Sequence, residues 1–225
     1  MLDAQGSAED IVAGKGGSTI FLLHGPPGCG KTVTAEAIAE MLEMPLYVVT
    51  AGDLGVTAAE VEKKLSEVLR LCAEWNALTL IDEADIFLET RSTQELQRNA
   101  IVCTMLRLLE YHQGVLFLTT NRAANIDPAV RSRITVSMRY KALDGAGRAA
   151  VWANFVPELD CAPLARFPLH GRQIKSCVRL AQALGAERNE ALSLQILERA
   201  VELVGDFGDD WQPEGEAQGA TQISL

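Results

Sequence analysis

The chain has 225 residues, of which 48% are hydrophobic, and its 30 acidic and 20 basic side chains give a formal net charge of −10. That size suits one α/β domain with a smaller appended unit, and the acidic balance weighs against binding to nucleic acid or to an anionic membrane. The five cysteines are odd in number and lack C-x-x-C spacing, and neither a signal peptide nor a membrane-spanning apolar stretch is present, so we expect a soluble, intracellular protein without disulfides or zinc.

The first predicted unit is an apolar strand, a glycine-rich loop and a helix, in that order. Residues 19–23 are typical of a buried parallel strand, and residues 32–44 have the spacing of an amphipathic helix. Between them, residues 25–32 follow the phosphate-binding pattern G-x-x-x-x-G-K-[ST]. Glycines let successive N–H groups point into one concavity, and the helix N-terminus adds unpaired donors. The loop predicts a nucleoside triphosphate ligand, the alternative being an ordinary glycine-rich turn.

The residue types in this loop suit a nucleotide bound with a metal ion. Lys31 can reach the β- and γ-phosphates, and the Thr32 hydroxyl can bind a Mg²⁺ ion that bridges them. The predicted nucleotide-binding residues of this segment are Gly25, Pro26, Pro27, Gly28, Cys29, Gly30, Lys31, Thr32 and Val33.

Strands and helices then alternate along the chain. Strands are predicted at 45–50, 77–81, 115–119 and 134–139, with helices at 57–75 and 94–111; Thr57 and Glu60 have the spacing of a capping box. This alternation predicts an α/β fold with a five-stranded parallel sheet and ligands at the carboxyl ends of the strands.

The pattern changes to helices alone after residue 143. Helices are predicted at 145–155, 171–184 and 189–204. We therefore expect an α/β nucleotide-binding domain over residues 1–143, a small helical lid over 144–204 and a disordered tail over 205–225.

Polar side chains follow the third and fourth strands. Asp82 and Glu83 come directly after the third strand, where Asp82 can hold the Mg²⁺ ion and Glu83 can orient and deprotonate the attacking water. Asn121 follows the fourth strand, where its amide can sense the γ-phosphate and help to place that water. The alternatives are an acidic loop cap for the carboxylates and an Asn-mediated turn.

These motifs together resemble the AAA/AAA+ ATPase module. The resemblance rests on the glycine loop, Asp82-Glu83, Thr120-Asn121 and residues 126–133, and it covers about residues 8–204. In amino-acid sequence, these segments are most similar to those of a group of AAA-type ATPases found in fungi. The resemblance implies a P-loop NTPase fold, ATP and Mg²⁺ as cofactors, the loop as Walker A, Asp82 and Glu83 as Walker B, and Asn121 as sensor 1. It also places the adenine beside Asp10-Ile11-Val12.

The resemblance further assigns three basic residues. Arg131 and Arg133 lie in the segment that supplies arginine fingers to a neighbouring subunit, with Arg133 our first choice, and Arg172 corresponds to the sensor 2 position. The alternatives are surface salt bridges for the first two and a solvent-exposed helix start for Arg172. Carried over in this way, the catalytic set is Glu83, Lys31, Asn121, Arg131 and Arg133, and the metal ligands are Thr32 and Asp82.

The predicted function is ATP hydrolysis that remodels an unidentified protein, in a homo-oligomer for which a hexamer is one arrangement. Threading motors of this type carry an aromatic pore loop after the second strand, whereas Gly52 to Val56 lacks the aromatic, leaving Leu54 and Val56 as weaker contacts or the segment as an ordinary loop. Residues 89–98 also have two interpretations: they form either a second pore loop or a solvent-exposed run of charged residues. An ATP-gated scaffold with little turnover is the alternative function. A DNA-processing enzyme would have the same fold, but the acidic net charge of this chain weighs against DNA binding.

Overall fold

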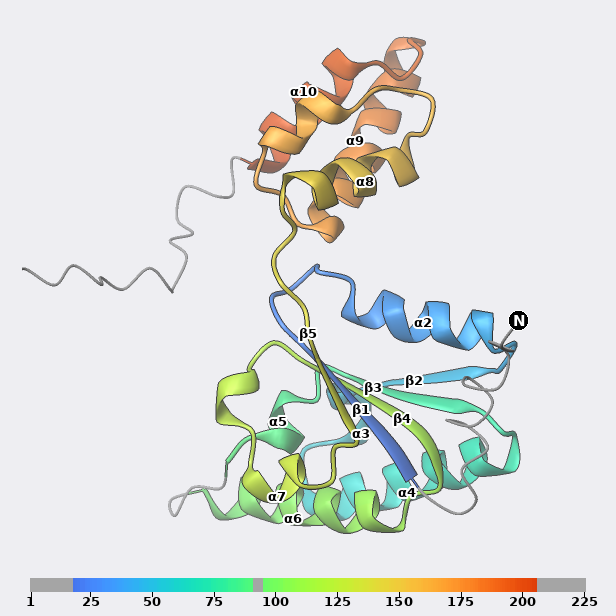
Figure 1. The fold of residues 1–225 in the computed structure, drawn as a ribbon, viewed down its shortest axis with the longest axis vertical. Helices are drawn as coiled ribbons and strands as arrows, with labels where there is room; N and C mark the ends of the chain where they lie inside the picture. Colours follow the sequence, from blue (N-terminus) through green and yellow to red (C-terminus); the bar gives the residue numbers. More distant parts are fainter. Residues whose placement is uncertain (1–17, 91–94, 206–225) are drawn as a thin grey trace, which may run out of the picture. The chain divides into compact units, whose positions relative to one another are not determined.

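The computed structural model describes residues 18–90 and 95–205 (Figure 1). They belong to two compact units, the first ending at Ala142 and the second beginning at Leu143. Each unit has its own hydrophobic core. The expected tail over 205–225 lies outside the described residues apart from Gly205.

The first unit is built on a five-stranded sheet in the order β2-β3-β4-β1-β5. All the paired strands are parallel, which confirms the predicted α/β fold of the P-loop NTPase type. The strands are β1 (Ser18–His24), β2 (Leu46–Thr50), β3 (Leu78–Asp82), β4 (Gly114–Thr120) and β5 (Val136–Arg139). Because β3, β4 and β1 are neighbours, the loops that follow them emerge side by side at one edge.

Helices cover both faces of this sheet (Figure 1). On one face, Ala35 and Ala39 of α2 (Lys31–Met41) pack in one cluster with Leu80 of β3. On the other, α4 (Ala58–Glu74) and α6 (Leu96–Tyr111) pack in a cluster that contains Ile81. Neighbouring residues of a strand point to opposite faces, so one strand serves both clusters. The shorter helices are α3 (Ala51–Leu54), α5 (Asp85–Leu88), η1 (Ala123–Asn125) and α7 (Pro128–Arg131).

The N-terminus of α4 has the capping box that its sequence predicts. The Glu60 amide donates to Thr57 Oγ1 over 3.3 Å, and the Thr57 amide donates to Glu60 Oε2 over 3.1 Å. Two donors that the helix leaves unpaired are satisfied in this way.

The second unit is helical. It contains α8 (Gly145–Phe155), η2 (Ala162–Arg166), α9 (Gly171–Arg188) and α10 (Leu194–Gly205), packed around the fully buried Trp152. The helix predicted from residue 189 begins only at Leu194, because Asn189 caps α9 in a left-handed conformation with φ of 55°. Across the described residues of both units, no helix has the length and apolar character that a membrane crossing requires.

Candidate active site

The candidate site forms at the edge of the sheet where β1, β3 and β4 end. Thr34 N donates to Gly30 O over 2.9 Å as the first bond of α2, so the amides of Lys31, Thr32 and Val33 precede the helical ladder. Gly30 connects loop to helix with φ of 99°, a conformation that favours glycine. The loop and the helix N-terminus therefore present N–H donors and a positive dipole end at this edge.

Lys31 links the loop to the end of β4. Its side chain is 8% exposed, and Nζ donates to Gly25 O over 2.9 Å, to Pro26 O over 2.7 Å and to Asn121 Oδ1 over 2.8 Å. The Cys29 sulfur lies 3.8 Å from the same nitrogen. An ammonium group has three protons, and three oxygen acceptors fix its position. Lys31 and Asn121, which were predicted separately as site residues, are thus in direct contact.

Thr32 and Asp82 also meet. Thr32 Oγ1 donates to the Asp82 carboxylate at 3.1 Å from Oδ1 and 3.3 Å from Oδ2. On its other side, Asp82 Oδ1 accepts a short hydrogen bond from the hydroxyl of Thr119, a buried residue of β4. Mg²⁺ in nucleotide sites takes one or two carboxylates together with phosphate oxygens and waters. The Thr32 hydroxyl and the Asp82 carboxylate are therefore oxygen ligands of the kind that Mg²⁺ takes.

In the part of the chain that the structure describes, no larger metal-binding group accompanies this pair. Within the described ranges, no three His, Cys, Asp or Glu side chains gather in a way that could hold a metal ion. Two protein ligands suit Mg²⁺, which retains several of its waters, rather than zinc with its closed set of four.

Glu83 has an unusual backbone conformation. It is exposed and has φ of 55°, a value that is uncommon for residues other than glycine. Its amide donates to Thr119 Oγ1 over 2.9 Å, and the next amide, that of Ala84, donates to Thr119 O over 2.9 Å. No partner of the Glu83 carboxylate is found in the described parts of the chain. The carboxylate that was predicted to act as a base is therefore free to accept a proton.

Two positively charged side chains act on His24, which ends β1 just before the loop. Burial, together with the positive charges of Arg139 and Lys31, lowers the pKa of His24 at the end of β1. His24 is therefore neutral near pH 7 and adds no further charge beside Lys31.

The three predicted arginines have different surroundings. Arg133, 30% exposed, donates to Ala129 O over 2.9 Å and to Glu110 Oε2 over 3.0 Å. Arg131 is exposed, and its guanidinium has no partner among the described side chains. Arg172 belongs to the second unit, where it is exposed at the second position of α9.

Two other predicted segments differ from the expectation or lie outside the described residues. Leu54, considered as a weak contact for a peptide, is 1% exposed and belongs to the core, because α3 turns its side chain inward; Val56 is 81% exposed. Asp10-Ile11-Val12, the expected adenine segment, lies outside the described residues.

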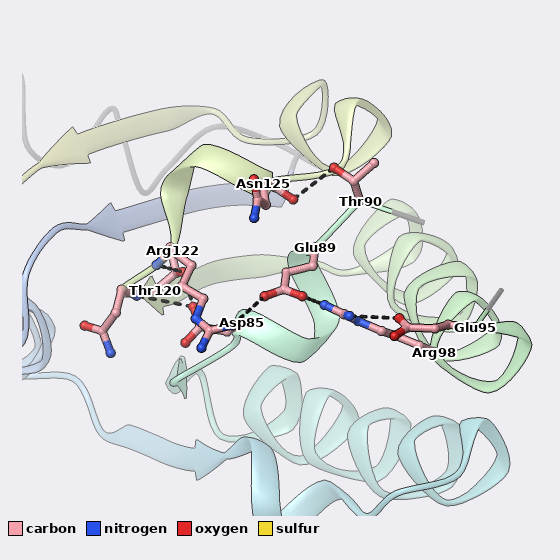
Figure 2. A network of polar contacts seen from close by, with 9 residues as sticks. Asp85, Glu89, Thr90, Glu95, Arg98, Thr120, Arg122 and Asn125 are labelled. Carbon is pink, nitrogen blue, oxygen red and sulfur yellow. Dashed lines mark hydrogen bonds and ion pairs between the residues drawn. The ribbon is translucent and has the colours of Figure 1, made fainter. Parts of the chain in front are cut away.

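The sequence also left residues of this site unassigned. Thr119 Oγ1 donates to Asp82 and accepts from the Glu83 backbone N–H, and the Asn121 backbone N–H donates to Asp85 Oδ1 over 3.2 Å. The signal for Thr119 was a hydroxyl at the last residue of the predicted strand 115–119, beside Asp82. Within the predicted charge run, Glu89 forms ion pairs with Arg98 and Arg122 and is only 14% exposed (Figure 2).

A parallel sheet with this strand order, a Gly-Lys-Thr loop that opens a helix, and an aspartate beside the threonine define a P-loop nucleoside triphosphatase fold.

The comparisons with known proteins place the chain more closely. The sequence model of the ATPase family associated with various cellular activities (AAA) matches residues 21–141, more than half of the chain. The chain belongs to the AAA family of ATPases. Members of this family bind and hydrolyse ATP, usually with Mg²⁺.

Individual relatives match over part of their length. The chain is 35% identical over 122 residues to mouse "Nuclear valosin-containing protein-like", which is 49% of this chain and 14% of the relative. It is 33% identical over 132 residues to human "ATPase family AAA domain-containing protein 3B", 53% of this chain and 19% of the relative. It is 28% identical over 202 residues to a "Putative 26S proteasome regulatory subunit homolog" of Methanothermobacter thermautotrophicus, 80% of this chain and 53% of the relative.

Proposed function

We propose that this chain binds ATP and Mg²⁺ at the loop and hydrolyses the β–γ phosphoanhydride bond. One observation carries the proposal: Lys31 is hydrogen-bonded to Asn121, and Thr32 to Asp82, at the edge where the Glu83 carboxylate has no partner among the described residues. Three strand ends thus supply a phosphate contact, a metal-ion contact and a base within one hydrogen-bonded group. Membership of the AAA family supports the choice of ATP.

Each residue has a separate role in this proposal. Lys31 and the loop amides bind the phosphates, and Thr32 and Asp82 hold the metal ion, which neutralises charge on the phosphates. Glu83 orients water and accepts its proton, because its carboxylate is exposed and has no partner among the described residues. Asn121 helps to place the water and the γ-phosphate. Arg172 is a further phosphate contact that rests on the resemblance to the family alone.

We also propose that an arginine of a neighbouring subunit completes the site, so that hydrolysis requires a homo-oligomer. Arg133 remains our first choice, since its bonds to Ala129 and Glu110 hold the guanidinium while leaving it 30% exposed. Arg131 is the second candidate, because it is exposed and lacks a partner among the described side chains. Either guanidinium can stabilise charge on the transferred phosphoryl group.

The energy of hydrolysis would remodel a protein or a complex. Because Leu54 belongs to the core, Val56 is the one exposed apolar side chain among residues 52–56 that is available to contact a peptide, which favours local remodelling over threading. The scaffold alternative, with bound ATP and little turnover, rests on this lack of a gripping side chain. Stimulation of turnover by a protein partner would favour remodelling, whereas binding of a partner without stimulation would favour the scaffold.

The experiment combines Glu83→Gln with two arginine variants. We expect Glu83→Gln to bind ATP but to lose hydrolysis by about a hundredfold or more, because an amide cannot accept the proton. Glu40→Gln, which changes an exposed glutamate on α2, is the control and should keep the wild-type rate. Wild-type hydrolysis by Glu83→Gln would refute its assignment as the base.

Mixing the variants tests the arginine. Arg133→Ala alone should be inactive if it acts in trans, and adding Glu83→Gln protein should restore turnover, because each Glu83→Gln subunit can supply Arg133 to an intact Glu83 next to it. Arg131→Ala is tested in the same way. If neither arginine variant regains activity on mixing, completion of the site by a neighbour is wrong.

A further inference from the structure

Asp85 binds the turn that carries Asn121. Thr120 Oγ1 donates to Asp85 Oδ1 in a short hydrogen bond, and the backbone N–H of Asn121 donates to the same oxygen over 3.2 Å. Thr120 Oγ1 in turn accepts from the Arg122 amide over 2.9 Å. One carboxylate and one hydroxyl thus fix three consecutive residues, the last residue of β4 and the two that follow it, as Figure 2 shows for the side chains of Asp85 and Thr120.

Asp85 is itself held by the bonds that join the ends of β3 and β4. Two of these bonds, from the amides of Glu83 and Ala84 to Thr119, precede it directly in the chain. Asp85 then begins α5, and its bond to Thr120 continues this series of hydrogen bonds between the end of β4 and the residues that follow β3. The carboxylate of Asp85 therefore has a defined position relative to Asp82 and Glu83.

The Asn121 side chain depends on this arrangement. Asn121 is exposed, so core packing does not select its rotamer. Its orientation comes from the turn backbone and from the bond between its Oδ1 and Lys31 Nζ, which measures 2.8 Å. If Asp85 released the turn, the Asn121 backbone N–H would lose its acceptor, and the turn would no longer hold the side-chain Oδ1 toward Lys31.

The other end of the turn is attached as well. Arg122 Nη1 lies 3.4 Å from Glu89 Oε1, and Glu89 is also paired with Arg98 of α6 (Figure 2). Next to Glu89, Asp127 N donates to Leu88 O over 2.7 Å. Both ends of α5 are therefore bonded to the segment that follows β4, with Asp85 at the end nearer to Lys31.

We propose that Asp85 is a positioning residue for the ATPase reaction. It acts through Thr120 and Asn121, and it holds the Asn121 amide oxygen toward Lys31 without contacting the nucleotide itself. The inference rests on the proposed function, since it assigns a residue to the same site. Because the bonds to Asp85 come from a hydroxyl and an amide, an uncharged acceptor at position 85 suffices.

The test compares Asp85→Ala, which removes the acceptor, with Asp85→Asn, which retains one. Asp85→Ala should lower kcat by between about tenfold and about a hundredfold, the scale of a misplaced contact, while the KM for ATP changes by less than about threefold. Asp85→Asn should restore most of the rate. Thr120→Val and Thr120→Ser should repeat this contrast, and Glu95→Ala, which removes only an exposed partner of Arg98, is the control and should match wild type.

A second readout does not need hydrolysis. In protein labelled with ¹⁵N, the Asn121 side-chain NH₂ signals should shift or broaden in Asp85→Ala and Thr120→Val but keep their positions in Asp85→Asn and Thr120→Ser. If the variants showed this NMR pattern but the wild-type protein did not hydrolyse ATP, the proposed function would be refuted and the positioning role of Asp85 would remain supported. Unchanged kcat in Asp85→Ala, an equal loss in Asp85→Asn, or unmoved Asn121 signals would each overturn the role of Asp85.

Discussion

His112 should make the first unit less stable in acid. It lies between α6 and β4, is 7% exposed, and its Nε2 atom is buried without a hydrogen-bond partner in the described structure. Burial lowers its pKa from 6.5 to about 4. A protonated imidazole at this position would need a partner for its buried N–H, so folding favours the neutral form.

The size of the effect follows from the two pKa values. Above pH 6.5, His112 is neutral in both the folded and the unfolded chain and contributes no pH dependence. As the pH falls, the unfolded chain takes up the proton first, so stability is lost between pH 6.5 and about 4. The loss is about 1.4 kcal/mol at pH 5.5 and about 2.5 kcal/mol at pH 4.5.

His112→Leu removes the titrating group, so the variant should gain about 2.5 kcal/mol relative to wild type when the pH is lowered from 7.5 to 4.5. Urea unfolding can be followed separately in each unit by labelling buried thiols with a pyridyl disulfide, which reacts in acid, and by mass spectrometry. Cys72 of α4 reports on the first unit and Cys177 of α9 on the second, since they are 2% and 0% exposed.

The Cys177 transition serves as the internal control and should be the same in wild type and variant at both pH values. A stability difference at Cys72 that is equal at pH 7.5 and pH 4.5 would show that His112 is not held in the neutral form.

Two further substitutions test the local geometry. Gly25→Ala should destabilise the first unit more than Gly114→Ala, because both have positive φ but a Cβ at Gly25 would lie 2.4 Å from Tyr140 O, whereas nothing lies within 4 Å at Gly114; equal unfolding midpoints would contradict this. Thr57→Ala should cost about 1 kcal/mol by loss of the α4 cap, measured by the Cys72 labelling described above, and no loss would mean that the capping box adds nothing to stability.

The sequence predicted the sheet well because its signals are local. Apolar strands followed by glycine, aspartate or asparagine mark buried parallel strands and their ends, and the five predicted strands match the observed sheet. The ends of helices were predicted less accurately where the conformation of a single residue decides them. Asn189 ends α9 by adopting a left-handed conformation, so the last helix begins later than its apolar pattern indicated.

Contacts across strands were harder to predict. Two of these contacts, Lys31 with Asn121 and Thr32 with Asp82, agree with the general rule that the carboxyl ends of parallel strands lie at the same edge of a sheet. Thr119 and Asp85 received no role because their function depends on which atoms face which, and this is fixed by the pairing of β3 with β4. The sequence left open whether Leu54 contacts a peptide or belongs to an ordinary loop, because its short helix, α3, has too few residues to give a periodic pattern.

The most direct test of the proposed chemistry is a single-turnover measurement on wild type and Glu83→Gln with Mg²⁺ and radiolabelled ATP, at protein concentrations where oligomers form. We expect both proteins to bind ATP with dissociation constants within about threefold of each other, and the release of phosphate to be about a hundredfold or more slower in Glu83→Gln. Equal rates of phosphate release from the two proteins would contradict the role of Glu83, and a wild-type protein that bound ATP without cleaving it would contradict hydrolysis by this chain.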